Sequence, residues 1–315
     1  MGKRETNDVN QSKKWFLECI RMREKYGIQH SDGPVMELTT MIGCPLMCSF
    51  CPQENLRDNY GNDTKYMSQV DLTKMLVKLP KNTRIDFSGM SEPWANPECT
   101  AMLEEVLYMG FKVAIYTTLY GMTDPARVKK VIEDHANQIE VVMLHLPDDN
   151  GNMRGWKPSQ EWMNAFETMA TLQVPCGVGA MTMDKGGVVH EFLRPYVGQL
   201  AGWVGHTRAD SLNVEQIGGQ VISMTPHNIF SLTCASTPFY DRNVLLPNGD
   251  VVICCMDYNL SHILGNLLTQ TYDEVMQGKP LLDLIALNEA PEYSKCSICK
   301  AVSYTHLTLP TILRV

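Results

Sequence analysis

Short runs rich in β-branched and apolar residues alternate with amphipathic segments from about residue 35 of this 315-residue chain. The predicted strands are residues 35–42, 83–89, 112–119, 139–146, 174–183 and 210–217. The predicted helices between them are residues 68–80, 96–110, 124–136 and 159–172. Strands that alternate with helices of this length form parallel βαβ units. The sequence therefore predicts an α/β fold, a partial (β/α)6 TIM-like barrel, with an active site at the carboxyl ends of the strands.

The first of these helices shows the clearest amphipathic pattern. Its apolar residues recur at steps of three and four, which is typical of a helix with one buried face. The face predicted to be buried consists of Val70, Leu72, Met75, Leu76 and Leu79.

The alternation ends near residue 220, and a cysteine-bearing region follows. Within residues 243–258, Asn248-Gly249 lies between two β-rich runs and predicts a hairpin. Residues 271–290 read as one or two helices. The last residues, YTHLTLPTILRV, continue no pattern and resemble read-through of a cloning adaptor. We expect four parts: an N-terminal extension (1–34), the barrel (35–225), a small C-terminal cysteine-rich domain (226–300) and a non-native tail (301–315).

Charge and hydropathy argue against two classes of partner. A net charge of −8 without a basic tract argues against nucleic acid, because binding to phosphates needs clustered Lys and Arg. No apolar run approaches the roughly 18 residues that a membrane-spanning helix needs. The polar N-terminus has no secretory signal, so we expect a cytoplasmic protein with no membrane partner.

The chain contains eleven cysteines, which in a reducing compartment favour metal ligation over disulfides. The single cysteines Cys19, Cys99 and Cys176 are expected to be small buried hydrophobic residues. The others fall into an early group of Cys44, Cys48 and Cys51 and a late group of Cys234, Cys254, Cys255, Cys296 and Cys299.

The early group lies in GCPLMCSFCPQ, residues 43–53. A structural zinc ion takes four ligands, commonly as two close pairs, but here only three cysteines are clustered and the nearest histidine is His30. Three thiolates suit an iron–sulfur cluster with one iron left open to a ligand that is not protein. The early group therefore predicts a catalytic site.

The spacing CxxxCxxC, with an aromatic residue before the last cysteine, resembles the signature of radical S-adenosylmethionine (SAM) enzymes. The resemblance implies that Cys44, Cys48 and Cys51 hold a [4Fe–4S] cluster, whose fourth iron binds the amino and carboxylate groups of SAM. It also implies that Phe50 lies near the adenine of SAM.

A second stretch, FSGMSEPWANP (87–97), resembles the glycine-rich segment with which this family contacts the SAM amino group. The resemblance implies cofactor-binding roles for Gly89, Ser91 and Glu92, although Ser91 stands where a glycine is common. Thr117 occupies the position where the family often shows a Thr-Asn-Gly stretch beside the cofactor.

The late cysteines resemble the SPASM/twitch auxiliary domain that follows the barrel in part of this family. The resemblance implies that a second, auxiliary [4Fe–4S] cluster, which carries electrons, is bound by Cys234, Cys254, Cys296 and Cys299. The doublet Cys254-Cys255 leaves open which of the two is the ligand, and a structural zinc ion is the alternative for this group.

Together these resemblances imply an oxidoreductase-type enzyme. An electron from a flavodoxin- or ferredoxin-type donor would cleave SAM reductively to a 5′-deoxyadenosyl radical, which abstracts hydrogen from the substrate. The segment 243–258, followed by HILGNLL (262–268), resembles SPASM-type proteins found with polysaccharide-biosynthesis genes, which implies dehydrogenation of a sugar or cyclitol. The alternatives are radical modification of a ribosomal peptide or protein side chain, and a zinc-stabilised binding module.

Four polar residues are catalytic candidates, each with a structural alternative. His145 and Asp148 lie at the predicted end of the fourth strand, where an aspartate beside Asn and Gly is often a turn former. Arg208 is a candidate for contact with the SAM carboxylate or a polar substrate, or for a surface ion pair. Asp257 is a candidate for approaching the substrate from the auxiliary domain.

Overall fold

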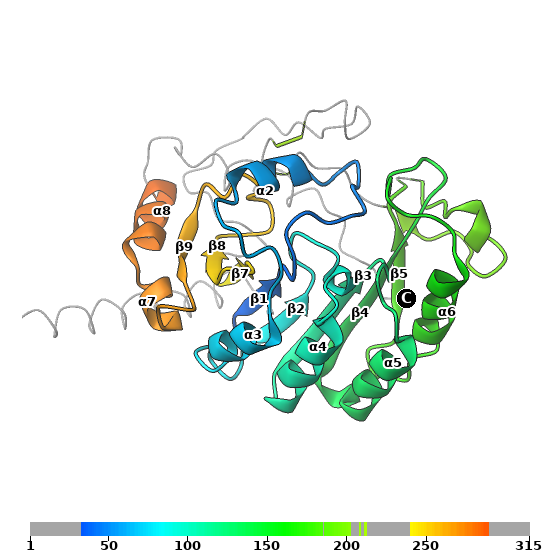
Figure 1. The fold of residues 1–315 in the computed structure, drawn as a ribbon, viewed down its shortest axis with the longest axis horizontal. Coiled ribbons are helices and arrows are strands. Elements are labelled where there is room, and N and C mark those ends of the chain that lie inside the picture. Colours follow the sequence, from blue (N-terminus) through cyan, green and yellow to red (C-terminus); the bar gives the residue numbers. More distant parts are fainter. Residues whose placement is uncertain (1–32, 185, 203–207, 209–210, 213–239, 290–315) are drawn as a thin grey trace, which may run out of the picture.

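The structure, a computed structural model, describes residues 33–184, 186–202, 208, 211–212 and 240–289. These residues form a nine-stranded sheet in the order β6-β5-β4-β3-β2-β1-β7-β8-β9. Figure 1 labels all of these strands except β6. The strands β1 to β7 pair in parallel, and β8 and β9 continue the sheet antiparallel. The strands are β1 (Val35–Leu38), β2 (Arg84–Phe87), β3 (Lys112–Thr117), β4 (Ile139–Leu146), β5 (Gly179–Thr182), β6 (Ala201–Gly202), β7 (Arg242–Leu245), β8 (Asp250–Val252) and β9 (Ile263–Asn266).

The parallel sheet with helices between its strands confirms the predicted α/β fold. The sixth strand differs from the prediction, because β6 at Ala201–Gly202 pairs with β5 ahead of the predicted range 210–217. Ser211 and Leu212 are not in a strand, and the rest of that range lies outside the described residues.

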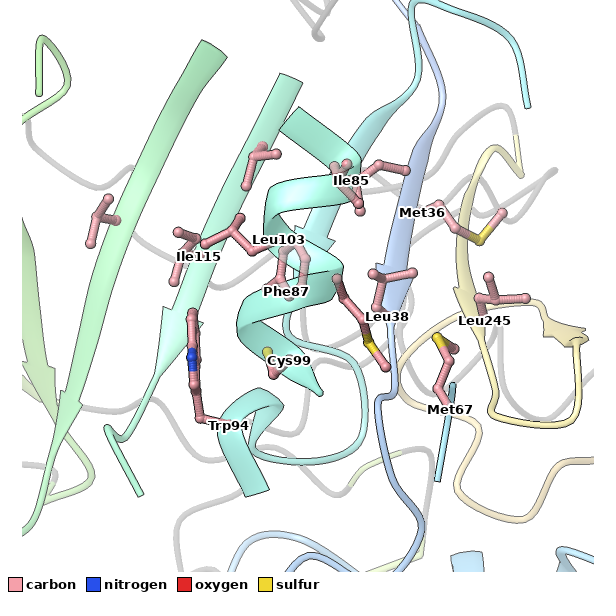
Figure 2. Packing of buried hydrophobic residues seen from close by; sticks show 14 of the residues in the cluster. Met36, Leu38, Met67, Ile85, Phe87, Trp94, Cys99, Leu103, Ile115 and Leu245 are labelled. Atoms are coloured by element: carbon pink, nitrogen blue, oxygen red, sulfur yellow. The ribbon is translucent and has the colours of Figure 1, made fainter. Parts of the chain in front are cut away.

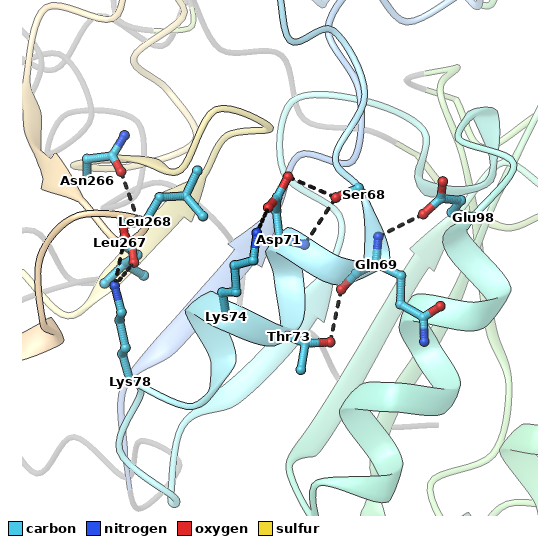
Figure 3. Close-up of polar contacts among 10 residues, drawn as sticks. All are labelled: Ser68, Gln69, Asp71, Thr73, Lys74, Lys78, Glu98, Asn266, Leu267 and Leu268. Atoms are coloured by element: carbon cyan, nitrogen blue, oxygen red, sulfur yellow. Dashed lines mark hydrogen bonds and ion pairs between the residues drawn. The ribbon is translucent and has the colours of Figure 1, made fainter.

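Four of the helices begin at side chains that accept from free backbone N–H groups. Ser68 caps α3 by accepting from the Asp71 N–H at 3.0 Å (Figure 3), and Asp124 and Ser159 cap α5 and α6 in the same way. Thr271 and Glu274 form a capping box at α7. The helices are α2 (Gln53–Asn59), α3 (Gln69–Leu76), α4 (Cys99–Tyr108), α5 (Pro125–Asp134), α6 (Gln160–Ala170), α7 (Tyr272–Met276) and α8 (Lys279–Glu289).

Alternate strand residues supply the core between the sheet and its helices. Leu38, Phe87 and Ile115 come from three neighbouring strands and pack near Leu103 of α4, as Figure 2 shows. All four are fully buried. Because side chains alternate across a strand, the intervening residues, such as Asp86, point to the other face.

That other face carries charged groups that are paired. Arg84 donates to both carboxylate oxygens of Asp86, at 2.7 and 2.9 Å, and its third contact is Glu140 at 3.4 Å. Burial raises the pKa of Asp86, while the Arg84 guanidinium opposes the shift. Burial also raises the pKa of Glu37, which accepts a hydrogen bond from Ser88 at 3.3 Å.

The cysteine-bearing region joins the same sheet. β7 pairs in parallel with β1, and the predicted hairpin forms between β7 and β8, where Gly249 adopts a φ of +87°. Lys78, just after α3, donates to the carbonyl oxygens of Leu267 and Leu268 beyond β9 (Figure 3). The boundary predicted at residue 226 lies outside the described residues.

Two details correct the sequence analysis. Val70 is 64% exposed, so it does not share the buried face of α3 with Leu72, Met75 and Leu76. Cys99 is buried as expected, but Cys176 is exposed, and Cys19 lies outside the described residues. In the part of the chain that the structure describes, every helix is too short or too polar to cross a membrane.

The two faces of α3 give a direct test of this fold. Replacing the fully buried Leu72 by Ala should lower the free energy of unfolding by about 2 to 5 kcal/mol, because it leaves a cavity. Val70→Ala, on the exposed face of the same helix, should change it by less than about 0.5 kcal/mol. Urea unfolding measures both, and similar losses for the two variants would contradict the placement of α3.

Candidate functional site

A cavity of about 340 Å³ lies at the carboxyl ends of β1 to β4. Both sequence motifs reach it, because parallel strands bring their following loops to the same edge of the sheet. The predicted site residues that line it are Cys44, Cys48, Phe50, Cys51, Gly89, Ser91, Glu92, His145 and Arg208.

The cysteine loop is tied to the glycine-rich loop by one buried amide. Gln53, the first residue of α2, accepts from the Cys44 N–H at 3.1 Å and donates to the Met90 carbonyl at 2.6 Å. Sequence reasoning did not single out Gln53. The available signal was an amide side chain two residues after the last cysteine of the motif.

A second loop, after β4, packs against the cysteine loop from the other side. Ser49 donates from its backbone to the Asn152 carbonyl at 2.9 Å, and from its hydroxyl to the Asn152 side chain at 2.6 Å. Gly155 donates to the Leu46 carbonyl at 2.8 Å, and a Cβ at Gly155 would lie 2.1 Å from the Pro45 oxygen. Only glycine allows this close approach.

The thiols of the early group are largely buried. Burial raises the pKa of Cys44 to about 12. It also raises the pKa of Cys48, and the neighbouring thiols of Cys51 and Cys44 add to the shift. Binding a metal centre here would therefore release protons, since thiolates are the ligand form.

The donor set of the early group suits an iron–sulfur cluster. A cluster distributes its thiolates over several irons, so the three cysteines around one cavity match its needs. Cys234, Cys296 and Cys299 lie outside the described residues, and Cys254 is half-buried just after β8.

The loop after β2 approaches β1 so closely that Gly89 is required. Gly89 has a φ of +62°, and a Cβ there would lie 2.5 Å from the Thr39 hydroxyl and 2.9 Å from the Leu38 oxygen. The Ser91 hydroxyl accepts from the Met41 N–H at 3.4 Å. The backbone around Gly89 therefore forms a fixed wall of the cavity.

The Glu92 carboxylate is held by hydrogen bonds from residues of its own loop and of the end of β3. Its carboxylate accepts from the Thr117 hydroxyl, the Thr118 hydroxyl and the Thr118 N–H, each at 2.7 Å, and from the Trp94 N–H at 3.3 Å. Burial raises the pKa of Glu92, and these hydrogen bonds oppose the shift. All four acceptor positions of the carboxylate are thus used. Thr118 lines the cavity, whereas Thr117 holds Glu92 from behind.

His145 and Tyr116 also line the cavity. The ring of His145 lies 6.2 Å from that of Tyr116, centroid to centroid. Burial lowers the pKa of His145 to about 4, and the nearby positive charge of Arg208 adds to the shift. At neutral pH the imidazole is therefore uncharged.

Arg208 and Tyr258 close the cavity beside the cysteines. Arg208 donates to the Phe50 carbonyl at 3.3 Å, and its guanidinium carbon lies 5.7 Å from the centre of the Tyr258 ring. The Tyr258 hydroxyl donates to the Cys51 sulfur at 3.7 Å. Sequence reasoning missed Tyr258, which follows the predicted candidate Asp257.

The two aspartate candidates organise loops. Asp148 accepts from the Asn152 side chain at 3.0 Å, which supports its reading as a turn former. Asp257 accepts from the backbone N–H groups of Ser261 and His262, at 2.9 and 2.8 Å. Neither aspartate lines the cavity as the described residues form it.

A larger cavity of about 600 Å³ lies beside the α5 and α6 N-termini. Its walls include Trp156 and Trp162, and Trp162 donates to the Thr118 carbonyl at 2.8 Å. The described residues around it include none of the predicted site residues. We therefore place the candidate site in the smaller cavity.

Replacing His145 by Gln should flatten the pH dependence of stability between about pH 6.5 and pH 4. Because the folded pKa lies below the ordinary 6.5, the unfolded chain binds more protons in this window, and wild type loses stability as the pH falls. The loss assigned to His145 is roughly 1 to 3 kcal/mol. Urea unfolding at pH 7 and pH 4.5 measures it, and equal losses in both proteins would contradict a neutral buried imidazole.

Comparison with known proteins supports the interpretation of the late cysteines as ligands of an iron–sulfur cluster. Residues 234–300 match the SPASM family, described as an iron–sulfur cluster-binding domain. This match favours an iron–sulfur cluster over zinc for the late cysteines. No curated protein sequence matches the chain.

One solved structure shares the fold at low identity, and two others are similar to a lesser degree. BtrN in complex with AdoMet and 2-DOIA superposes with a TM-score of 0.51 at 14% identity, over 85% of this chain and 92% of that chain. For anSMEcpe with bound AdoMet, the TM-score is 0.49 at 14% identity, over 82% of this chain and 81% of that chain. For Streptococcus suis SuiB bound to precursor peptide SuiA, the TM-score is 0.48 at 13% identity, over 93% of this chain and 80% of that chain. The chain therefore has the fold of the radical SAM enzymes with a C-terminal SPASM segment, as its cysteine motifs predicted.

Proposed function

We propose that this chain is an enzyme that binds SAM and a [4Fe–4S] cluster and dehydrogenates a sugar- or cyclitol-like small molecule. One observation carries the proposal: the three thiols of the early group and the backbone around Gly89 line the same cavity. The motifs are about forty residues apart in the sequence, so only the fold brings them together.

The resemblance to radical SAM enzymes implies which residues would hold the cofactors, and their position around one cavity supports that assignment. Cys44, Cys48 and Cys51 would bind the cluster, and the wall at Gly89 would contact SAM. Phe50 is buried in the same wall and supplies an apolar surface for the adenine. When bound, this cofactor pair supplies the hydrogen-abstracting chemistry that no protein side chain provides.

The chain's own groups would exclude water and orient the substrate. Leu46, Met153, Met181 and Met183 give the cavity apolar walls, which protect a reactive species from solvent. Arg208 provides a permanent positive charge at one side.

His145 would orient a substrate hydroxyl through a hydrogen bond and would not act as a base that accepts the hydroxyl proton. A pKa of about 4 makes the imidazole a weak base, but each of its ring nitrogens can still form a hydrogen bond. Tyr116 lines the cavity beside it and offers a second hydroxyl partner. Paired donors and acceptors of this kind suit a polyhydroxylated substrate.

The structural comparison also supports a small substrate. BtrN, whose structure superposes over 92% of its length, was solved in complex with AdoMet and 2-DOIA.

The cluster assignment predicts a specific iron content. After anaerobic reconstitution, the wild-type protein should hold about eight irons and a variant with Cys44, Cys48 and Cys51 all replaced by Ala about four, if each site holds a [4Fe–4S] cluster. Iron and sulfide analysis measures this. A wild-type protein that binds zinc in place of iron would refute the proposal.

Activity is tested on the iron-loaded protein. With dithionite, SAM and a deuterated sugar or cyclitol, wild type should form 5′-deoxyadenosine that carries deuterium, and the triple cysteine variant should form none. If deuterium were transferred from deuterated peptides but from no sugar or cyclitol, the substrate would be a peptide and not a small molecule. An iron-loaded wild type that leaves SAM intact would contradict the proposed reaction.

Gly89→Ala should weaken SAM binding at least tenfold, because the Cβ would push the loop away from Leu38 and Thr39. Gly61→Ala is the matched control, since a Cβ at Gly61 meets no atom within 4 Å. Equilibrium dialysis of SAM against both iron-loaded variants measures the affinities. Equal affinities would show that the Gly89 loop does not form the SAM site.

A further inference from the structure

A tyrosine from the C-terminal segment contacts the predicted cluster site. Tyr258 is 1% exposed, and its hydroxyl donates to the Cys51 sulfur across 207 residues of sequence. Buried tyrosine hydroxyls usually find a partner. Here the partner is the sulfur of a predicted cluster ligand.

The position of Tyr258 is fixed by its surroundings. Its ring packs in a hydrophobic cluster with Tyr60, Met90 and Leu260, among others. The Arg208 guanidinium lies over the ring, and the neighbouring Asp257 secures the following turn through two backbone N–H groups. The hydroxyl is therefore held toward Cys51 by groups that do not themselves depend on a bound cofactor.

A hydrogen bond to a cluster sulfur changes the reduction potential. Reduction adds negative charge to the sulfurs, and a donor that points at them stabilises the reduced form more than the oxidised one. A donor to the Cys51 thiolate would therefore raise the potential of the cluster. A less negative potential makes it easier for a biological donor to deliver the electron.

Building on the proposed function, we propose that Tyr258 is a positioning residue that tunes the reduction potential of the cluster held by Cys44, Cys48 and Cys51. Tyr258 also lies close in sequence to one predicted ligand of the auxiliary cluster. The turn that carries Tyr258 starts at Cys254, the predicted auxiliary ligand, and the Asp257 N–H donates to the Cys254 carbonyl at 3.1 Å. The C-terminal segment thus contributes directly to the first cluster's surroundings.

The test compares Tyr258→Phe with Tyr60→Phe in the iron-loaded full chain. Tyr60 is buried in the same hydrophobic cluster, but its hydroxyl donates to the Thr64 carbonyl at 2.7 Å, away from the cysteines. Redox titration with detection by electron paramagnetic resonance gives the potentials. The signal that is absent from the triple cysteine variant belongs to the first cluster.

We expect Tyr258→Phe to make the potential of the first cluster more negative at unchanged iron content, and Tyr60→Phe to leave it at the wild-type value. Incorporation of 3-fluorotyrosine at position 258, a stronger donor, should shift the potential in the opposite direction. A wild-type potential in Tyr258→Phe with full iron content would overturn this inference alone. Absence of iron from the wild-type protein would overturn it together with the proposed function.

Discussion

The site depends on one buried carboxylate. Glu92 is 5% exposed, and a buried carboxylate is costly unless it is hydrogen-bonded, so the site relies on its four hydrogen bonds to Thr117, Thr118 and Trp94. These bonds join the loop after β2 to the end of β3. The Thr40 hydroxyl extends the connection to the end of β1 by donating to the Pro93 carbonyl at 2.9 Å. Three strand ends are thereby cross-linked around the cavity.

Local patterns predicted the elements and the motifs, but not their long-range contacts. The alternation of strands and helices and the Asn248-Gly249 hairpin are encoded within a few residues, and the structure contains both. Gln53 and Tyr258 act on groups 37 and 207 residues away, which no periodicity records. Val70 stands two residues before Leu72, about 200° around a helix of 3.6 residues per turn, so the period itself places Val70 off the buried face and the prediction was wrong to include it.

The acidic candidates show a second limit of sequence reading. Glu92, Asp148 and Asp257 all stand near strand ends and were all candidates for contact with a ligand. In the structure their oxygens accept from backbone N–H groups of their own or neighbouring loops. An acid that shapes a loop and an acid that binds a ligand look alike in the sequence, because both can follow a strand end and only their contacts in the fold distinguish them.

The parallel pairing of β1 with β7 has a consequence for how the chain folds. Because β1 lies inside the sheet, it has a partner on each side, one from the barrel and one from the C-terminal region. Folding of the barrel therefore cannot finish until a strand some two hundred residues later has docked, and pairing over so long a separation is slow. Until then β1 presents an open edge to which other chains can add. Ribosomal synthesis delivers that closing strand late, so the emerging barrel passes through a period of vulnerability to aggregation.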